Sequence, residues 1–330
     1  MTPWSAGARN DLTDIAGLSV GQAEDARLES GTSVVVFDEP TVASLSILGG
    51  APGTRETNLL DPENLVGGVD ALVLSGGSAF GLDAASGVQA RLREQGRGFS
   101  VGSARVPIVP AAILFDLLNG GDKDWGRFPP YRDLGYEAAA SASRDPVRLG
   151  RYGAGFGATT ARMRGGLGSA SCVLSFGTTI GAIVAVNAVG SPTIGTGRHF
   201  WASPFEIDGE FGGTGLPSTL PDDATEPYSK IRVAEGANTT IAILVTDARL
   251  DKASCKRLAV AGQDGFVRSI WPSHTDFDGD LVFAAATARN DGPRTNVERI
   301  ELMAAASAVM ARAVARGVYE ANRDIFGAAT

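Results

Sequence analysis

Apolar and polar positions along the chain follow two patterns: short β-branched or aliphatic runs, and longer stretches with helical spacing. The short runs predict strands over residues 32–37, 42–47, 70–75, 174–176, 180–189, 239–246 and 281–287. The longer stretches predict helices over residues 82–95, 134–143, 252–262 and 296–322. Strands and helices therefore alternate, with glycines at many of the joints, which indicates a mixed α/β chain.

Three local features refine this outline. Asp38-Glu39-Pro40 predicts a turn-like bend between the first two strands. Residues 180–189 are almost continuously apolar, which is typical of a strand buried on both faces. Thr295 and Glu298 have the spacing of a capping box, and they predict the start of the last and longest helix.

The segment 203–236 has a different character. Aspartate, glutamate, glycine, proline, serine and threonine dominate it, and three prolines interrupt any periodicity. We expect a long exposed connection, and connections of this length inside a compact protein are usually functional or disordered. This one leads directly to Asn238 and Thr239.

Composition excludes several classes of function. With 330 residues, 44% hydrophobic and 20% charged, the chain is globular, and its net charge of −8 argues against a nucleic-acid partner or an anionic membrane surface. The first residues lack the apolar core of a secretory signal, and no apolar stretch suits a membrane span, so we expect a cytoplasmic protein. Two cysteines and two histidines leave no basis for a disulfide framework, and we expect no metal and no cofactor. His199 and His274 are expected to be structural, although His274 lies close enough in sequence to Asp278 and Asp280 to line a pocket with them.

The glycine-rich turn 76–81, between a predicted strand and a predicted helix, matches no phosphate-binding or dinucleotide fingerprint and no nucleophile elbow. Close packing of the helix on the strand explains it.

Three aspartates alternate at positions 276, 278 and 280. A calcium loop is disfavoured because Leu281 and Thr287 stand where the pattern needs glycine and glutamate. A solvated turn is one interpretation. The other is that Asp278 and Asp280 project to the same side of an extended chain, where two carboxylates can bind a hydroxyl or ammonium group and shift each other's pKa.

Thr239 opens a predicted strand, as β-branched residues commonly do. The alternative is that it becomes an N-terminal nucleophile after cleavage of its own preceding peptide bond. A free α-amino group, with a pKa of about 8, then serves as the base that a threonine hydroxyl otherwise lacks. Such a site needs neither histidine nor cysteine.

Several longer motifs resemble those of the L-aminopeptidase/D-esterase (DmpA-type) family, which includes β-peptidyl aminopeptidases and the nylon-oligomer hydrolase. They lie at residues 49–57, 59–66, 74–85, 106–116, 165–171 and 238–241. The resemblance runs from about Thr13 through the last helix. It implies a single domain, 1–330, folded as a four-layer αββα sandwich similar to the N-terminal-nucleophile hydrolases, with its own DmpA-type connectivity.

The resemblance also implies a site. The chain is expected to cleave itself between Asn238 and Thr239, and the fragments 1–238 and 239–330 are expected to stay associated in a homo-oligomer such as a tetramer. Thr239 would be the nucleophile, Asp278 and Asp280 would orient it together with its amine, and Asn187 would help to form the oxyanion hole.

Two positions depart from the family. Arg162 stands where several members have a lysine, and an arginine cannot act as a base. Phe115 stands where some members have a tyrosine that donates to the oxyanion. We expect both to contact substrate. The expected activity is an aminopeptidase or amidase acting on small peptides, amides or esters; the alternatives are an endo-amidase acting on linear ω-amino-acid oligomers and a non-catalytic scaffold.

Overall fold

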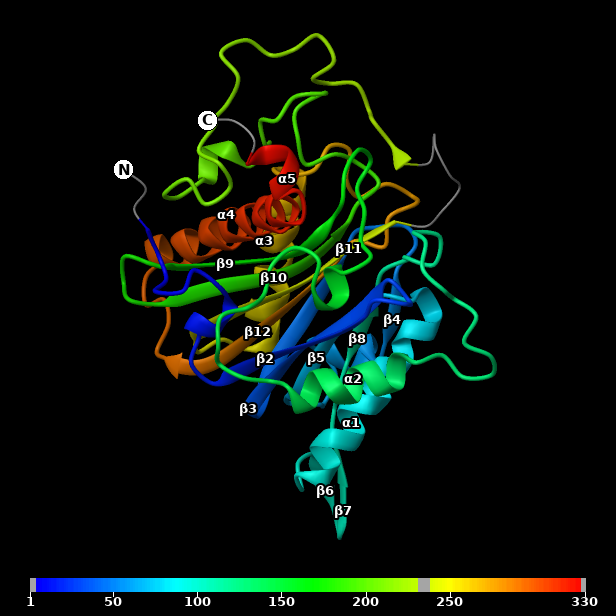
Figure 1. Cartoon of the computed structure of the whole chain (residues 1–330). Coiled ribbons are helices and arrows are strands. Elements are labelled where there is room, and N and C mark those ends of the chain that lie inside the picture. The colour runs from blue at the N-terminus through cyan, green and yellow to red at the C-terminus, as the bar shows by residue number, and fades with distance from the viewer. Residues whose placement is uncertain (1–3, 231–237, 328–330) are drawn as a thin grey trace.

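A computed structural model describes residues 4–230 and 238–327 (Figure 1). The strands are β1 (Ser5–Ala6), β2 (Leu18–Asp25), β3 (Ser30–Ile47), β4 (Gly53–Arg55), β5 (Val69–Ser75), β6 (Phe99–Val101), β7 (Ala104–Val106), β8 (Ala111–Ile113), β9 (Gly166–Val173), β10 (Thr179–Asn187), β11 (Thr239–Ala248) and β12 (Leu281–Asn290). The α-helices are α1 (Ala84–Glu94), α2 (Tyr131–Ala140), α3 (Lys252–Val267), α4 (Asn296–Ala321) and α5 (Arg323–Phe326).

Hydrogen bonds connect ten of these strands: nine follow the order β1-β9-β10-β11-β12-β3-β5-β8-β4, and β2 pairs with β3 beside this path. β6 and β7 form a separate pair. The long strand β3 joins two sheets. Its C-terminal part, residues 42–47, pairs with β12, whereas its N-terminal part pairs with β2 and β5. The two sheets therefore form two layers that share one strand.

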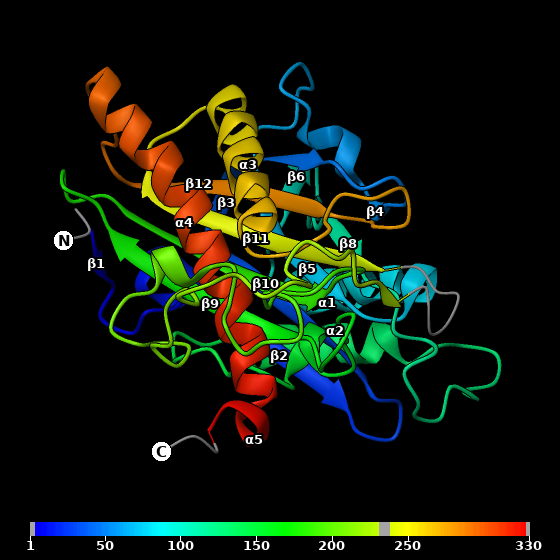
Figure 2. The ribbon, with the colours of Figure 1, turned by 90° about the horizontal axis from the view of Figure 1, so that it is seen from above.

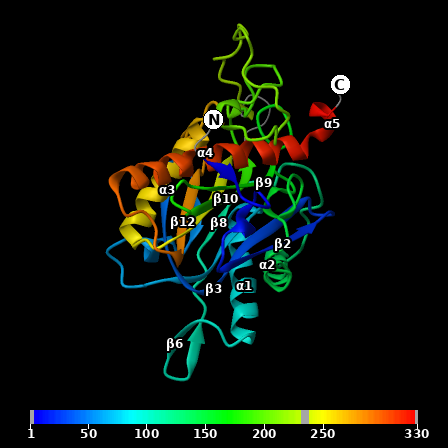
Figure 3. The same ribbon diagram turned by 90° about the vertical axis from the view of Figure 1, so that its left-hand side faces the viewer.

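The helices and sheets form four layers (Figures 2 and 3), and three apolar clusters lie between them. One cluster lies between α3, α4 and the sheet of β9–β12, and includes Leu244 and Met310. The second joins the inner faces of the two sheets, with Ile243 and Val35 among its members. The third lies between the other sheet and α1 and α2, and includes Val73 and Val88. Neighbouring residues of one strand belong to different clusters because side chains alternate across a sheet. The αββα sandwich expected from the resemblance is confirmed.

The structure corrects the prediction of two separate strands around Asp38-Glu39-Pro40. Residues 30–47 form one continuous strand, and the exposed tripeptide lies in an irregularity where the pairing with β5 shifts between Val36 and Thr41. A strand can contain such a bulge and change direction without ending. The local sequence of these residues is nevertheless typical of a turn, which is why two strands were predicted.

The predicted strand 174–176 is also wrong. Leu174 and Gly177 form the turn between β9 and β10, in which the N–H of Leu174 donates to the carbonyl of Thr178. The strand before this turn, β9, was not predicted, nor was β2. Both contain small and polar residues whose buried environment comes from their neighbours.

The remaining predicted elements are present with shifted ends. The helix predicted over 82–95 begins at Ala84, because a 3₁₀ turn, Ser78–Asp83, follows the glycines. The capping box of Thr295 and Glu298 is formed at the start of α4. Among the described residues, no helix is long and apolar enough to cross a membrane.

The segment 203–230, called the arm below, runs over α4 in Figures 1 and 3. The expectation of an exposed connection is wrong for several of its residues. Phe211 and Ala224 are buried, and the buried carboxylate of Glu210 is paired with Arg312 and Arg316 of α4. The polar composition of the arm gave no indication of these buried contacts. Residues 231–236, part of the same predicted loop, lie outside the described residues.

Candidate active site

The two central strands of one sheet bring Asn187 and Thr239 together. Asn187 is the last residue of β10, Thr239 is the first of β11, and the antiparallel register pairs them directly. Side chains of directly opposed residues lie on the same face of a sheet, with Cβ atoms about 5 Å apart. Both residues are buried. Two positions far apart in the sequence therefore contribute to one site.

The bond between Asn238 and Thr239 is held by its neighbours. The Thr239 hydroxyl donates to the Asn238 carbonyl oxygen at 2.6 Å, and the N–H of Gly279 donates to the same oxygen at 2.8 Å. The N–H of Asn238 donates to the Phe277 carbonyl at 3.2 Å. Two donors on one carbonyl withdraw electron density from its carbon, so this peptide bond is polarised toward attack by a hydroxyl that is already adjacent.

The approach of Gly279 to Thr239 requires glycine. A Cβ added at Gly279 would lie 2.7 Å from the Thr239 hydroxyl oxygen and 2.8 Å from the Ala51 carbonyl oxygen. Both distances are shorter than any tolerated contact, so only a residue without a side chain can place its N–H against the Asn238 carbonyl.

Asp278 and Asp280 lie in the segment that leads into β12, which runs parallel to β11. Asp280 accepts from the N–H of Thr240 at 2.8 Å, directly after the predicted nucleophile. Asp278 accepts from the hydroxyl of Thr275 at 2.7 Å and from the N–H of Val189 at 3.3 Å. Both acids are buried, so the interpretation of this segment as a solvated turn is wrong for them.

The environments of the two acids differ. Burial, together with the nearby charge of Asp280, raises the pKa of Asp278 to about 6. The pair therefore takes up a proton at a higher pH than a solvent-exposed carboxylate would. This agrees with the expectation that two carboxyl groups so placed shift each other's pKa.

The glycine-rich segment after β3 fixes the acids. The N–H groups of Leu48 and Gly49 donate to the Asp280 carbonyl, and that of Ala51 donates to the Asp278 carbonyl. A Cβ at Gly49 would lie 2.3 Å from the backbone of both acidic residues. The first motif of the resemblance thus fixes the backbone of the two acidic residues.

The side-chain amide of Asn187 has one orientation that its partners allow. Its Nδ2 donates to the Phe115 carbonyl oxygen at 2.9 Å, and its Oδ1 accepts from the N–H of Thr159 at 3.0 Å and from the ammonium of Lys230 at 3.1 Å. Since the carbonyl needs a donor and the other two groups need an acceptor, the amide cannot be flipped. One hydrogen of Nδ2 remains available beside Thr239.

Lys230 is the site residue that the sequence did not reveal. Its ammonium also donates to the Thr159 carbonyl and hydroxyl oxygens and to the Asn187 carbonyl oxygen. Burial lowers its pKa to about 7, although Asp278 partly offsets this effect. The one signal in the sequence is that lysine is far rarer than arginine in this chain. Lys230 lies in the arm, whose polar composition predicts exposure to solvent instead of a place in the site.

Phe115 and Arg162, both expected to contact substrate, are placed differently. Phe115 contributes its backbone carbonyl to the Asn187 amide. Arg162 is exposed, with its guanidinium 4.4 Å from the centre of the Tyr228 ring, so its charge faces an aromatic ring of the arm. The lysine that contacts the Asn187 side chain comes from the arm.

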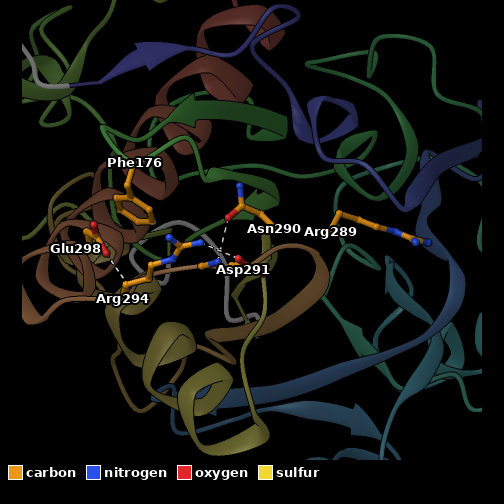
Figure 4. A pocket seen from close by; sticks show the side chains of 7 residues that line it. Phe176, Arg289, Asn290, Asp291, Arg294 and Glu298 are labelled. Atoms are coloured by element: carbon orange, nitrogen blue, oxygen red, sulfur yellow. Dashed lines mark hydrogen bonds and ion pairs between the residues drawn. The ribbon is translucent and has the colours of Figure 1, made fainter.

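A polar pocket shown in Figure 4 lies elsewhere. It is lined by residues that include Asn290, Asp291 and Arg294, at the end of β12 remote from Asp280. A strand of this length separates the two ends by roughly 30 Å at about 3.3 Å per residue. Within the pocket, Arg294 pairs with Asp291 at 2.8 Å. This pocket is therefore separate from the cluster around Thr239.

Comparisons with known proteins find relatives along nearly the whole chain. The model of peptidase family S58 matches residues 10–327. An uncharacterized aminopeptidase of Mycobacterium tuberculosis is 40% identical over 332 residues, covering 95% of this chain and 94% of its own. A 6-aminohexanoate-oligomer endohydrolase of Agromyces is 29% identical, with 86% of this chain and 76% of its own covered.

Solved structures have the same fold. The L-aminopeptidase D-Ala-esterase/amidase of Ochrobactrum anthropi superimposes with a TM-score of 0.67 at 20% identity, covering 96% of this chain and 88% of its own. A Burkholderia β-aminopeptidase does so with a TM-score of 0.66 at 21% identity, covering 95% and 87%.

Proposed function

Because the chain belongs to peptidase family S58, and is thereby a peptide-bond hydrolase, we propose that it processes itself and uses Thr239 as an N-terminal nucleophile. Its substrates in this proposal are small peptides, amides or esters from which it releases the N-terminal residue. The observation that carries the proposal is the hydroxyl of Thr239 against the Asn238 carbonyl, with the N–H of Gly279 on the same oxygen.

Processing begins with attack of the Thr239 hydroxyl oxygen on the Asn238 carbonyl carbon. The N–H of Gly279 stabilises the negative charge on the carbonyl oxygen in the tetrahedral intermediate. The carbon–nitrogen bond then breaks, and the hydroxyl proton ends on the departing nitrogen. The resulting ester is hydrolysed by water, which leaves a carboxylate on Asn238 and a free α-amine on Thr239.

The mature site uses that amine as its base. The amine takes the hydroxyl proton while the oxygen attacks a substrate carbonyl, so that the missing histidine is not needed. The free hydrogen of Asn187 Nδ2 points to the oxyanion, and Asp278 and Asp280 hold the amine and the end of β11. Lys230 supports this step by fixing the Asn187 amide in its donating orientation.

The architecture supports continued association of the two fragments. β11 begins at Thr239 and lies between β10 of the first fragment and β12 of the second. α4 of the second fragment packs on the sheet of the first through the cluster that includes Val184 and Val309. Cleavage at residue 238 leaves these contacts intact. We propose that the processed chain works in a homo-oligomer in the cytoplasm.

One other activity has a specific observation in its favour. The similarity to a 6-aminohexanoate-oligomer endohydrolase favours an endo-amidase acting on linear ω-amino-acid oligomers. Hydrolysis of amino-acid p-nitroanilides by the purified protein, compared with hydrolysis of linear aminohexanoate oligomers, separates the two activities. The proposal predicts the faster release from p-nitroanilides. Absence of hydrolysis of both, in a protein that is folded and intact, would favour a scaffold with this fold.

A further inference from the structure

We propose that His274 is a positioning residue that acts on the nucleophile through Asp280. The inference rests on the proposed function and deepens it, because it assigns a role to a side chain that the sequence suggested was only structural. His274 precedes the acidic segment and lies beside α3, where the centre of the Phe266 ring is 6.1 Å from the imidazole.

The contacts form a short chain from His274 to the start of β11. The Nδ1 of His274 lies 2.9 Å from one carboxylate oxygen of Asp280, and the backbone N–H of His274 donates to the same oxygen at 3.1 Å. The other carboxylate oxygen accepts from the N–H of Thr240 at 2.8 Å. Asp280 thus connects the imidazole to the residue next to the nucleophile.

The carboxylate determines the tautomer of the imidazole. An ionised carboxylate only accepts hydrogen bonds, so Nδ1 carries the hydrogen and donates it to Asp280. The Nε2 atom is buried without a hydrogen-bond partner in the described part of the chain. Although burial lowers the pKa of His274, the hydrogen bond and the charge of Asp280 raise it above its usual value, and Nδ1 carries its hydrogen in both the neutral and the charged imidazole.

The backbone at His274 is held in a costly conformation to make this contact. Its φ of +56° lies in the left-handed region, which residues other than glycine seldom adopt. The conformation directs both the N–H and the imidazole of one residue to a single oxygen of Asp280. A histidine that only filled space would not need it.

The consequence concerns the orientation of the Asp280 carboxylate. His274 supplies two of the donors to one of its oxygens, while the other oxygen accepts from the N–H of Thr240. The titratable groups that face the imidazole are Asp280 and Asp278, while α3 presents the Phe266 ring and the backbone of Gln263. Removal of the Nδ1 donor should therefore let the Asp280 carboxylate turn away from Thr240, so that both self-cleavage and hydrolysis slow.

The test uses His274→Leu, which removes the donor, and His274→Asn, whose amide can donate from a similar position and which tolerates the left-handed backbone. His199→Leu is the matched control, because that histidine binds the Gly215 carbonyl in the arm. Rates of self-cleavage after cell-free synthesis, and kcat for a p-nitroanilide, are measured from pH 5 to 9 together with the melting temperature.

We expect His274→Leu to lower both rates roughly 10- to 100-fold across this pH range. His274→Asn should recover most of the rate because its amide supplies the donor again, and His199→Leu should keep both rates. Should the leucine variant fail to fold, His274→Gly, which relieves the backbone strain, carries the same expectation. Wild-type rates in the donor-free variants, or no recovery in His274→Asn, would overturn the role of His274. An uncleaved and inactive wild type would instead refute the proposed function.

Discussion

Asn187 lies directly opposite Thr239 in the antiparallel pairing of β10 with β11. The strand register, rather than a flexible loop, sets the distance between the predicted oxyanion donor and the predicted nucleophile. The amide is fixed in turn by Phe115, Thr159 and Lys230, so the donor is organised before any substrate arrives. Such preorganisation is a major source of catalytic rate enhancement.

Replacing Asn187 separates its role as an acceptor for Lys230 and Thr159 from its proposed role as a donor to the oxyanion. Asn187→Asp keeps an acceptor for Lys230 and Thr159 but loses the donor, and we expect kcat to fall about 10²- to 10³-fold with a smaller change in KM. Steady-state kinetics on a p-nitroanilide measure this effect in protein that has already been processed. Asn187→Ala should be no faster. An unchanged kcat in both variants would remove Asn187 from the oxyanion hole.

Gly279→Ala tests the close approach at the cleavage site. The new methyl group would overlap the Thr239 hydroxyl and the Ala51 carbonyl, so we expect the chain to remain uncleaved or to be cleaved at least about 10²-fold more slowly. Gly67→Ala is the control, because a Cβ at that exposed glycine meets nothing within 4 Å. The appearance of the two fragments on a denaturing gel reports the rates. Equal rates in the two variants would contradict the geometry.

The long motifs of the resemblance implied the four layers and the proposed site residues. Local patterns predicted most of the strands and helices. The apolar run at β10 and the capping box of α4 are of this kind. The continuity of β3 and the burial of β9 depend on neighbours that are distant in the sequence, and local patterns do not encode them.

For a related reason, the sequence did not reveal Lys230 and gave no sign of the contact between His274 and Asp280. Lys230 reaches the site from the arm, whose polar composition predicts exposure to solvent. The arm is held against α4 by the ion pair of its Glu210 with Arg312. His274 becomes informative only when its backbone conformation and its contact with Asp280 are known. Single residues of this kind belong to no sequence pattern, so their place in the site becomes visible only from their tertiary contacts.

The buried ammonium of Lys230 predicts a pH dependence of stability. Burial lowers its pKa to about 7, whereas an unfolded lysine titrates near 10.4. Between these values the unfolded chain binds more protons, so the free energy of unfolding contributed by this group rises with pH, by at most about 1.4 kcal/mol per unit. The gain should begin near pH 7 and end near pH 10.

Urea unfolding of the wild type and Lys230→Met at pH 7 and pH 9 measures this difference. We expect the wild type to gain stability relative to the variant as the pH rises. Lys252→Met is the control, because that lysine also donates to backbone carbonyls but lies near the surface, and its pH slope should match the wild type. Parallel slopes for the wild type and Lys230→Met would show that the ammonium is not buried.

The arm should be held by the buried ion pair of Arg312 and Glu210. Arg312 donates to both carboxylate oxygens and also to the Ser171 carbonyl and the Asn10 side chain. Arg312→Met leaves the buried carboxylate with the more distant Arg316 as its charged partner, and we expect a loss of about 3–5 kcal/mol in the free energy of unfolding.

Arg323→Met removes an exposed pair with Glu320 and should cost less than about 1 kcal/mol. Adding Glu210→Gln to Arg312→Met should recover part of the loss, because the carboxylate is no longer charged. Chemical denaturation of the three variants gives these values. A similar small cost for Arg312→Met and Arg323→Met would argue against a structural role for the buried pair.

The mass of the purified protein under denaturing conditions tests the central claim most directly. We predict two species, residues 1–238 and 239–330, whose masses add up to the intact chain of 34.0 kDa plus one water, and a single uncleaved, inactive species for Thr239→Ala. An intact wild-type chain that nevertheless hydrolyses amides would contradict an N-terminal threonine nucleophile.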